Sequence, residues 1–386
     1  MPIRILVVDD EPDVELLFRQ RLRRKIRDET YAFVFALNGV DALTKFEQEQ
    51  DFDLVLSDIN MPKMDGLSLL ANLKNKSNYL KTIMVSAYGD MKNIRTAMNG
   101  GAFDFVTKPI DFSDLEATIN KAIGVVNNLK QAERTRKELT HIQRDLAIAS
   151  QVQKSSIPSD FQAVANRHAV DLHAEMLTAK AVGGDFYDYY SLDDHRLAFV
   201  IGDVSGKGMP AALFMSVSKT LLKATMLRGA PLKECVSTVN TLLCQDNARG
   251  MFLTLFFGIL DLSSKELIYC NCGHNPPAMW KNGGEVELFE KSTNIPLGIR
   301  EEFEFETIKI GFAKGTVLSL YTDGVTEAIN SENQRFGDQR LLEFLRNKSD
   351  CSPQQVIHHL IEHVQDFTNG MPQSDDITVL ILKNSA

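Results

Sequence analysis

The sequence has no uninterrupted apolar run of about 18 residues, the length that a membrane-spanning helix requires. Its most apolar stretch, at 211–227, is interrupted by Lys219 and Lys223. The first ten residues, MPIRILVVDD, have too short an apolar part and turn acidic too soon for a signal peptide. We therefore expect a soluble protein with no membrane association, located in the cytoplasm.

Cysteine is scarce, and acidic residues outnumber basic ones. The five cysteines are an odd number scattered through 386 residues, unlike the disulfide framework of a small secreted domain. Cys270 and Cys272 have no second pair at zinc-finger spacing, so reduced thiols are expected and no zinc site is predicted. The net charge of -9 argues against a broad nucleic-acid interface, which needs a basic face.

The first 120 residues alternate short apolar runs with helical stretches, which predicts βαβ units and a parallel sheet. Four strands are expected, at Ile3–Val8, Asp53–Asp58, Lys81–Ser86 and Phe103–Lys108. In open α/β sheets, ligands bind beyond the carboxyl ends of the strands. The side chains expected to meet at that edge are those of Asp9, Asp10, Asp58, Ser86 and Lys108.

Three carboxylates in one place repel one another, and a divalent cation relieves that repulsion. Oxygen ligands of this kind suit Mg²⁺. A lysine and a hydroxyl beside them could hold a phosphoryl group. The alternative is that each acid is a solvated loop residue or a helix cap.

The stretches VVDDE, DINMPKMDG, VSAYGD and VTKPID together resemble the receiver domain of two-component response regulators, which implies a doubly wound α/β fold with a five-stranded parallel sheet. The resemblance implies that Asp58 accepts a phosphoryl group from a sensor histidine kinase or a phosphotransfer protein. It also implies that Asp9, Asp10, Asp58 and the backbone carbonyl of Asn60 bind Mg²⁺. By the same resemblance, Lys108 neutralises developing charge and Ser86 binds phosphoryl oxygens. Phe105 is either the aromatic switch residue or a plain core residue, and Lys108-Pro109 is expected to be cis.

A helical connector follows. Between Leu115 and Ile157 the sequence has no proline, and apolar residues recur in steps of three and four, which places them on one helix face. This pattern fits a parallel coiled coil in a homodimer or one long helix packed on its own domains. Pro158 should end the helix. We divide the chain into a domain at 1–122, a helical linker at 123–157 and a second domain at 158–386.

The second domain repeats one arrangement, in which an acid lies beside small residues next to an apolar strand. The stretches are GGDFYD at 183–188, GDVSGKG at 202–208, YTDGVTEA at 321–328 and SDDITV at 374–379. The first could also be a degenerate cyclase GGDEF motif, but it has Phe186 where that motif has an acid. Clustered aspartates without histidine or thiol partners favour Mg²⁺ or Mn²⁺. Two such ions can support hydrolysis of a phosphoester.

These stretches, with CNCGHNPPAMW at 270–280, resemble the PPM-type metal-dependent protein phosphatases, in particular the bacterial sporulation and stress-response branch. The resemblance implies a β-sandwich of two antiparallel sheets flanked by helices. It also implies two Mn²⁺ or Mg²⁺ ions, with Asp203 bridging them and the carbonyl of Val204 adding a ligand. The aspartates implied as ligands are Asp185, Asp203, Asp323 and Asp375.

Several neighbouring residues keep more than one interpretation. Asp376 could orient a ligand, bind a third ion or cap a turn. Asp188 could contact the metal ligands without binding a metal itself. His274 is either a general acid or a packed histidine. Gly206 and Gly208 are expected in a tight turn. No phosphate-binding arginine of the eukaryotic branch can be placed.

The resulting hypothesis is a response regulator whose output is a phosphoserine/phosphothreonine protein phosphatase controlled through Asp58. The resemblance further implies that the substrate is a phosphorylated anti-sigma-factor antagonist. The alternative is a signalling adaptor that binds a phosphoprotein without hydrolysing it. A DNA-binding output is disfavoured, since the second domain is large and lacks a basic recognition stretch.

Overall fold

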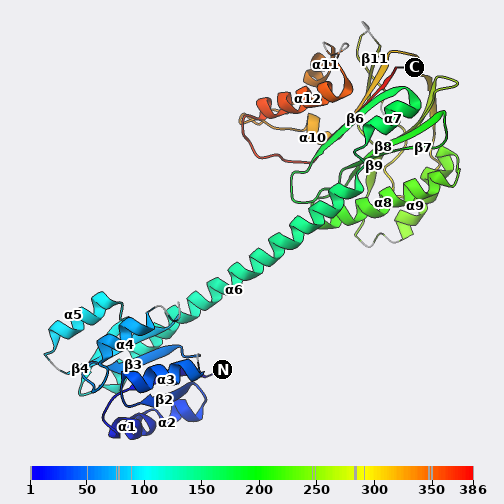
Figure 1. The fold of residues 1–386 in the computed structure, drawn as a ribbon. Coiled ribbons are helices and arrows are strands. Elements are labelled where there is room, and N and C mark those ends of the chain that lie inside the picture. Colours follow the sequence, from blue (N-terminus) through cyan, green and yellow to red (C-terminus); the bar gives the residue numbers. More distant parts are fainter. Residues whose placement is uncertain are drawn as a thin grey trace. The chain divides into compact units, whose positions relative to one another are not determined.

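The fold comes from a computed structural model that describes residues 2–49, 51–74, 76, 79–87, 89–245, 247, 249–281, 285–290, 292–346, 348 and 351–385. The chain forms two compact units, Met1–Ile142 and Gln143–Ala386, whose elements are labelled in Figure 1. Within the described residues, no helix is long and apolar enough to cross a membrane.

The N-terminal unit contains a five-stranded parallel sheet in the order β2-β1-β3-β4-β5, which confirms the predicted doubly wound fold. The strands are β1 (Ile3–Val8), β2 (Tyr31–Ala36), β3 (Leu54–Asp58), β4 (Lys81–Ala87) and β5 (Asp104–Lys108). Four of them match the expected strands, whereas β2 was not among those predicted. The Lys108-Pro109 peptide is cis, as expected.

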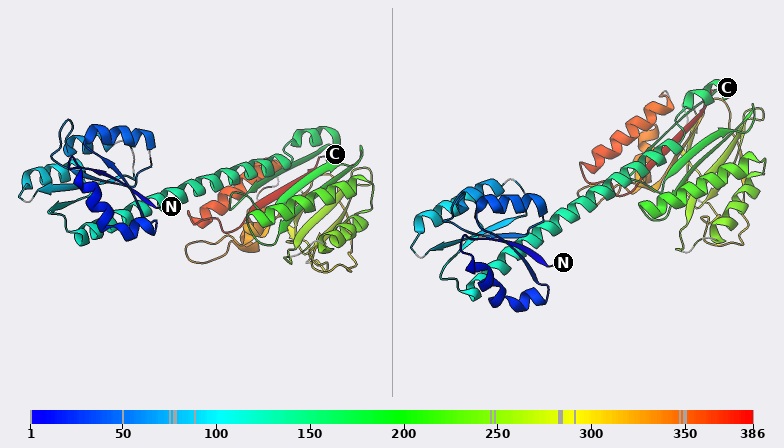
Figure 2. Two further views of the ribbon diagram at one scale, coloured as in Figure 1. Left: turned by 90° about the horizontal axis from the view of Figure 1, so that it is seen from below. Right: turned by 60° about the horizontal axis from the view of Figure 1, so that its bottom comes forward.

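Helices cover both faces of this sheet (Figures 1 and 2). They are α1 (Asp13–Arg21), α2 (Arg23–Arg27), α3 (Gly39–Glu49), α4 (Gly66–Leu73), α5 (Met91–Gly100) and the first turns of α6 (Phe112–Ser156). Side chains alternate along β1 because successive residues of a strand point to opposite faces. Ile5 therefore packs with α1 and α6, and Leu6 packs with α3 and α4.

Helix α6 begins earlier than the predicted linker and ends at Ser156, two residues before Pro158. Its first turns belong to the N-terminal core, since Leu115, Ile119 and Ile123 are buried there. Further along, Leu139 and Ile142 are exposed on one face of the helix, and Ile148 and Val152 are exposed on the opposite face. The two compact units meet in sequence at Ile142 and Gln143, inside the predicted linker. The linker boundaries and the coiled coil stay predictions.

The C-terminal unit contains two antiparallel five-stranded sheets, as the sequence predicted. One has the order β13-β10-β9-β8-β7, with strands at Ile308–Gly311, Glu266–Cys272, Leu253–Asp261, Arg196–Val204 and Phe186–Ser191. The other has the order β12-β11-β14-β15-β6, with strands at Glu287–Leu288, Ala278–Lys281, Thr316–Tyr321, Ile377–Asn384 and Val170–Leu177.

The two sheets pack face to face, with helices on their outer faces. Leu380 and Leu382 of β15 point into the core between the sheets, and Ile381 between them points to the opposite face. In the described residues of this unit, the last turns of α6 are followed by α7 (Phe161–His168), α8 (Met209–Leu227), α9 (Leu232–Gln245), α10 (Asp323–Thr326), α11 (Gly337–Arg346) and α12 (Pro353–Thr368). Helices α8 and α9 cover the first sheet, and α11 and α12 cover the second.

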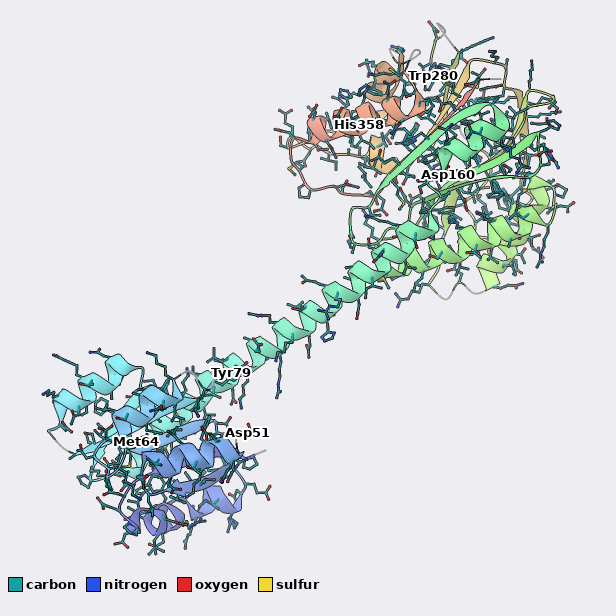
Figure 3. All side chains as sticks on the ribbon, viewed as in Figure 1. Asp51, Met64, Tyr79, Asp160, Trp280 and His358 are labelled. Atoms are coloured by element: carbon teal, nitrogen blue, oxygen red, sulfur yellow. The ribbon has the colours of Figure 1, made fainter. Side chains whose placement is uncertain are left out.

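Local signals in the sequence set where these helices begin. Asp160, labelled in Figure 3, caps α7 because its carboxylate accepts the backbone N–H of Ala163 at 3.1 Å. Gly208 precedes α8 with φ +78°, and Pro210 lies in the first turn, as expected for a glycine turn followed by a helix start. These boundaries place the GDVSGKG stretch at the end of β8 and the start of α8.

Candidate functional site

The N-terminal unit gathers the predicted acids at the carboxyl edge of its sheet. One oxygen from each of Asp9, Asp10 and Asp58 lies within 4.8 Å of the others, and Asp9 and Asp58 are buried. Burial raises the pKa of Asp9, and the negative charge of Asp58 raises it further. The hydrogen bond from the backbone N–H of Glu11 and the positive charge of Lys108 lower this pKa, but the net shift is upward. Three carboxylate oxygens in one place fit a hard cation such as Mg²⁺.

Lys108 lies among these acids. Its Nζ is 2.7 Å from a carboxylate oxygen of Asp58 and 3.0 Å from one of Asp9. It also lies 3.3 Å from Glu11, a contact that the sequence did not predict. Burial alone would lower the pKa of Lys108, but its hydrogen bonds with Asp58 and Asp9 raise it. The lysine is therefore a fixed positive charge beside Asp58.

The other predicted residues of this edge lie on the loops and strands around Asp58. The N–H of Asn60 donates to Asp58 at 3.2 Å. Ser86 is fully buried, and its hydroxyl has no hydrogen-bond partner in the described part of the chain. A buried hydroxyl without a partner is uncommon and fits a group that binds a ligand oxygen. Phe105 is half-buried and packs on a small cluster that includes Ile59 and Met84.

In the C-terminal unit, four segments that are distant in sequence bring five aspartates into one electrostatic cluster. Asp185 directly precedes β7, Asp203 lies near the end of β8, and Asp323 begins α10. Asp375 and Asp376 directly precede β15. Asp203 is repelled by Asp323, Asp375 and Asp376. The structure thus brings these five aspartates within electrostatic range of one another, although among the described residues no three of them place an oxygen within 4.8 Å of the others, as the acids of the N-terminal unit do.

Mutual repulsion and burial change how these acids titrate. Burial, and then the charge of Asp203, raises the pKa of Asp185 well above its usual range. Burial, followed by Asp323, raises the pKa of Asp203 to about 7. Burial and the charge of Asp375 raise the pKa of Asp323 to about 6. A cluster of carboxylate donors with raised pKa values fits a site that binds hard divalent cations, because a cation removes the repulsion.

Two threonines that the sequence analysis missed fix the orientation of Asp185. The hydroxyls of Thr322 and Thr378 each donate to the same carboxylate oxygen of Asp185 at 2.7 Å. Both threonines are fully buried. Each lies within two residues of a predicted acid, Asp323 or Asp376, and this proximity was the signal available in the sequence.

Asp376 organises the backbone around the cluster. Its two carboxylate oxygens accept the N–H of Ala179 at 2.7 Å and that of Gly184 at 2.8 Å. A side chain at Gly183 would place its Cβ 2.0 Å from Asp376, and one at Gly184 would lie 2.8 Å from the Val204 carbonyl oxygen. Both positions therefore require glycine, because Asp376 and the Val204 carbonyl lie too close to the backbone for a side chain. Of the interpretations left open for Asp376, these contacts match the turn-capping one.

Asp188 and His274 have partners outside the cluster. Asp188 is buried and pairs with Lys219 at 2.8 Å and Lys223 at 3.3 Å, both on α8. A ring nitrogen of His274 lies 3.0 Å from the hydroxyl of Thr254, and burial lowers the pKa of His274 to about 4. His274 is therefore a neutral, packed histidine near pH 7.

Lys207 supplies positive charge at the rim of the cluster. Its Nζ lies 2.8 Å from a carboxylate oxygen of Asp375. This hydrogen bond, together with nearby acids, raises the pKa of Lys207. The GDVSGKG stretch contained this lysine, but only the fold brings it to Asp375.

Comparison with known proteins agrees with the geometry of both units. Residues 5–120 match the response regulator receiver domain. Residues 193–385 match the family described as Stage II sporulation protein E (SpoIIE). The SiaA-PP2C domain of Pseudomonas aeruginosa shares the fold with a TM-score of 0.58 and 19% identity, over 64% of this chain and 98% of that domain.

Two relatives share longer parts of the sequence. Phosphoserine phosphatase RsbU of Bacillus subtilis is 25% identical over 275 residues, which cover 70% of this chain and 79% of RsbU. Protein IcfG of Synechocystis sp. is 31% identical over 236 residues, 54% of this chain, but the chain spans only 37% of IcfG.

The C-terminal unit thus has the fold of the PP2C phosphatase domains, and the family match and the relative RsbU support a protein serine/threonine phosphatase. The chain belongs to the Stage II sporulation protein E (SpoIIE) family and carries a response regulator receiver domain at its N-terminal side.

Proposed function

We propose that this protein is a response regulator whose output is hydrolysis of phosphoserine or phosphothreonine on a protein substrate. The observation that carries the proposal is the cluster of aspartates that four segments of the C-terminal unit build around Asp203. The name of the relative RsbU, a phosphoserine phosphatase, supports the same substrate chemistry.

In this proposal, Asp185, Asp203, Asp323, Asp375 and the carbonyl of Val204 hold two Mn²⁺ or Mg²⁺ ions. Such ions, when bound, supply the Lewis acidity that phosphoester hydrolysis requires. Thr322 and Thr378 keep the carboxylate of Asp185 in one orientation. In the reaction, a water oxygen bonds to phosphorus, the bond from phosphorus to the seryl oxygen breaks, and that oxygen takes up a proton.

Recognition of the substrate phosphate involves the rim of the same cluster. Lys207 is the cation that the described residues place next to Asp375. It offers an ammonium group where a dianionic phosphate would approach. This lysine compensates for the arginine that could not be placed from the sequence.

The receiver controls this activity through Asp58. A carboxylate oxygen of Asp58 attacks the phosphorus of a phosphohistidine on a kinase or phosphotransfer protein, and the phosphorus–nitrogen bond breaks. Lys108 neutralises charge on the transferred group, and the hydroxyl of Ser86 donates to one of its oxygens. Asp9, Asp10 and the carbonyl of Asn60 hold Mg²⁺ beside Asp58, and Phe105 repacks when Asp58 is phosphorylated.

Helix α6 carries the signal in this proposal, since one continuous helix extends from Phe112 to Ser156. Its apolar Leu139, Ile142, Leu146 and Ala149 recur in steps of three and four, and this spacing favours pairing with a second copy of the chain as a coiled coil. The proposed substrate is a phosphorylated anti-sigma-factor antagonist, and the proposed location is the cytoplasm.

The test is phosphate release from a phosphoserine protein by the purified chain in Mn²⁺. The activity should disappear in Asp323→Ala, because that substitution removes a proposed ligand from the cluster. Undiminished release by Asp323→Ala would contradict the proposed site.

A further inference from the structure

One polar side chain of α6 is buried against the loop that leads into the aspartate cluster. Gln153 is 6% exposed, whereas its neighbours Val152 and Lys154 are exposed. Its Nε2 donates to the carbonyl of Gly183 at 2.7 Å, and its Oε1 accepts the N–H of Gly183 at 3.1 Å. The carboxamide therefore satisfies both backbone groups of a single glycine.

An apolar side chain could fill the same space if packing were the only requirement. Glutamine is rarely fully buried, and a buried amide without partners costs free energy. Both polar atoms of the Gln153 amide are paired, and both pairs are with Gly183. The contact therefore fixes the position of this loop and does more than cover it.

The loop is held equally firmly on its other side. The N–H of Gly184 donates to Asp376 at 2.8 Å, and neither glycine has room for a side chain. The next residue is Asp185, whose carboxylate is oriented by Thr322 and Thr378. Gln153 and Asp376 thus fix the backbone of Gly183 and Gly184, the two residues that directly precede Asp185.

A second contact connects the end of α6 to β7, the strand that directly follows Asp185. Lys219 Nζ lies 2.9 Å from the carbonyl of Ser156 and 2.8 Å from the carboxylate of Asp188 on β7. Asp185 therefore lies between two points, Gly183 and Asp188, that are tied to the last turns of α6. A shift of these turns would move the main chain at Asp185.

We propose that Gln153 is a positioning residue for metal binding at Asp185, acting through the backbone of Gly183. The proposal rests on the proposed function, because it takes Asp185 as a metal ligand. It assigns a role in metal affinity to α6, an element that contributes no ligand of its own.

The test is the Mn²⁺ affinity of the full chain carrying Gln153→Met, measured by isothermal titration calorimetry. Methionine keeps the length of the side chain and removes both hydrogen bonds. Loss of a group that hydrogen-bonds a metal ligand directly typically weakens affinity by about 10- to 100-fold, and because Gln153 acts through Gly183 we expect a Kd increase toward the lower end of that range. Phosphate release should then recover at saturating Mn²⁺, which a general packing defect would not allow.

Gln151→Met is the matched control, since Gln151 lies on the same helix and is exposed. It should leave the Mn²⁺ Kd unchanged. Thermal unfolding without metal shows whether Gln153→Met is folded. If it is not, Gln153→Glu replaces it, because glutamate keeps the acceptor for the Gly183 N–H and loses only the donor. Weaker Mn²⁺ binding is expected there despite the added negative charge.

An unchanged Mn²⁺ Kd in the folded Gln153 variant would overturn the proposal. This outcome is separable from a failure of the proposed function. If the wild-type chain binds Mn²⁺ but releases no phosphate, the phosphatase proposal fails while the comparison of affinities still decides the role of Gln153.

Discussion

The ammonium group of Lys207 and the carboxylate of Asp375 form an ion pair of 2.8 Å at the edge of the aspartate cluster. In the metal-free protein, this lysine provides part of the positive charge that a bound cation would provide. Lys207 therefore competes for a carboxylate that the proposed site needs, and in the proposed function it also binds the substrate phosphate.

Lys207→Met should tighten Mn²⁺ binding by several-fold, on the order of the 1 kcal/mol that a partly exposed ion pair contributes. The same variant should raise the KM for a phosphoprotein, because a cation facing the phosphate is lost. Calorimetry and steady-state phosphate release measure the two effects. Weaker Mn²⁺ binding in Lys207→Met would mean that the lysine supports the site instead of competing with cations.

Thr378→Val removes one of the two hydroxyls that hold Asp185. The lost hydrogen bond favoured the ionised carboxylate, so the pKa of Asp185 should rise further and Mn²⁺ affinity should fall by about 10- to 100-fold at pH 7. Ser319→Ala is the control, because the Ser319 hydroxyl is buried and has no partner among the described residues. Equal Mn²⁺ affinities in the two variants would argue against the role of Thr378.

The aspartate cluster should make the metal-free protein less stable as pH rises. The folded-state pKa values of Asp203 and Asp323, about 7 and about 6, exceed the usual 3.8. The folded state therefore binds more protons than the unfolded state between these values, and its stability falls as pH rises toward about 7. Above that pH the effect is complete.

Thermal unfolding of the metal-free chain at pH 5 and pH 7.5 measures this effect. The decrease in melting temperature should be smaller in Asp203→Asn, whose amide does not titrate. Mn²⁺ should reverse the trend in the wild type, since binding requires ionised carboxylates and improves as pH rises. A pH dependence that is identical in wild type and Asp203→Asn would contradict the raised pKa of Asp203.

Insertion of four helix-forming residues after Leu129 tests whether α6 transmits the signal. Four residues add about one helical turn, which keeps the register of the helix faces approximately and lengthens the helix. Control by Asp58 should be lost while basal phosphate release continues. Phosphodonor-dependent activity that survives the insertion would indicate a direct contact between the domains instead.

Much of the fold could be predicted because local patterns are strong where each acid follows or precedes an apolar strand. Asp58 at the end of β3 and Asp376 before β15 are examples. Strand β2 was missed, although its Tyr31–Ala36 is an apolar run that pairs with β1 in parallel. No acid follows that strand to mark its end.

The sequence could not show how the acids are held in place. The hydrogen bonds from Thr322 and Thr378 to Asp185 join residues that are 137 and 193 positions apart. Gln153 was counted as part of a helical connector, because nothing in the helix pattern distinguishes an inward glutamine from an exposed one. Long-range side-chain contacts of this kind depend on packing that only the folded chain supplies.

The most direct test of a receiver-controlled phosphatase is phosphate release from a phosphoserine protein by the full chain in Mn²⁺, with and without a small-molecule phosphodonor. Wild type, Asp58→Ala and Asp323→Ala are compared. We predict that the donor changes the rate of phosphate release in wild type only. The rate in Asp323→Ala should fall by more than about 100-fold, the upper end of the loss typical for a residue that only hydrogen-bonds a metal ligand. Metal-bound wild type that releases no phosphate, with or without the donor, would contradict the proposed function.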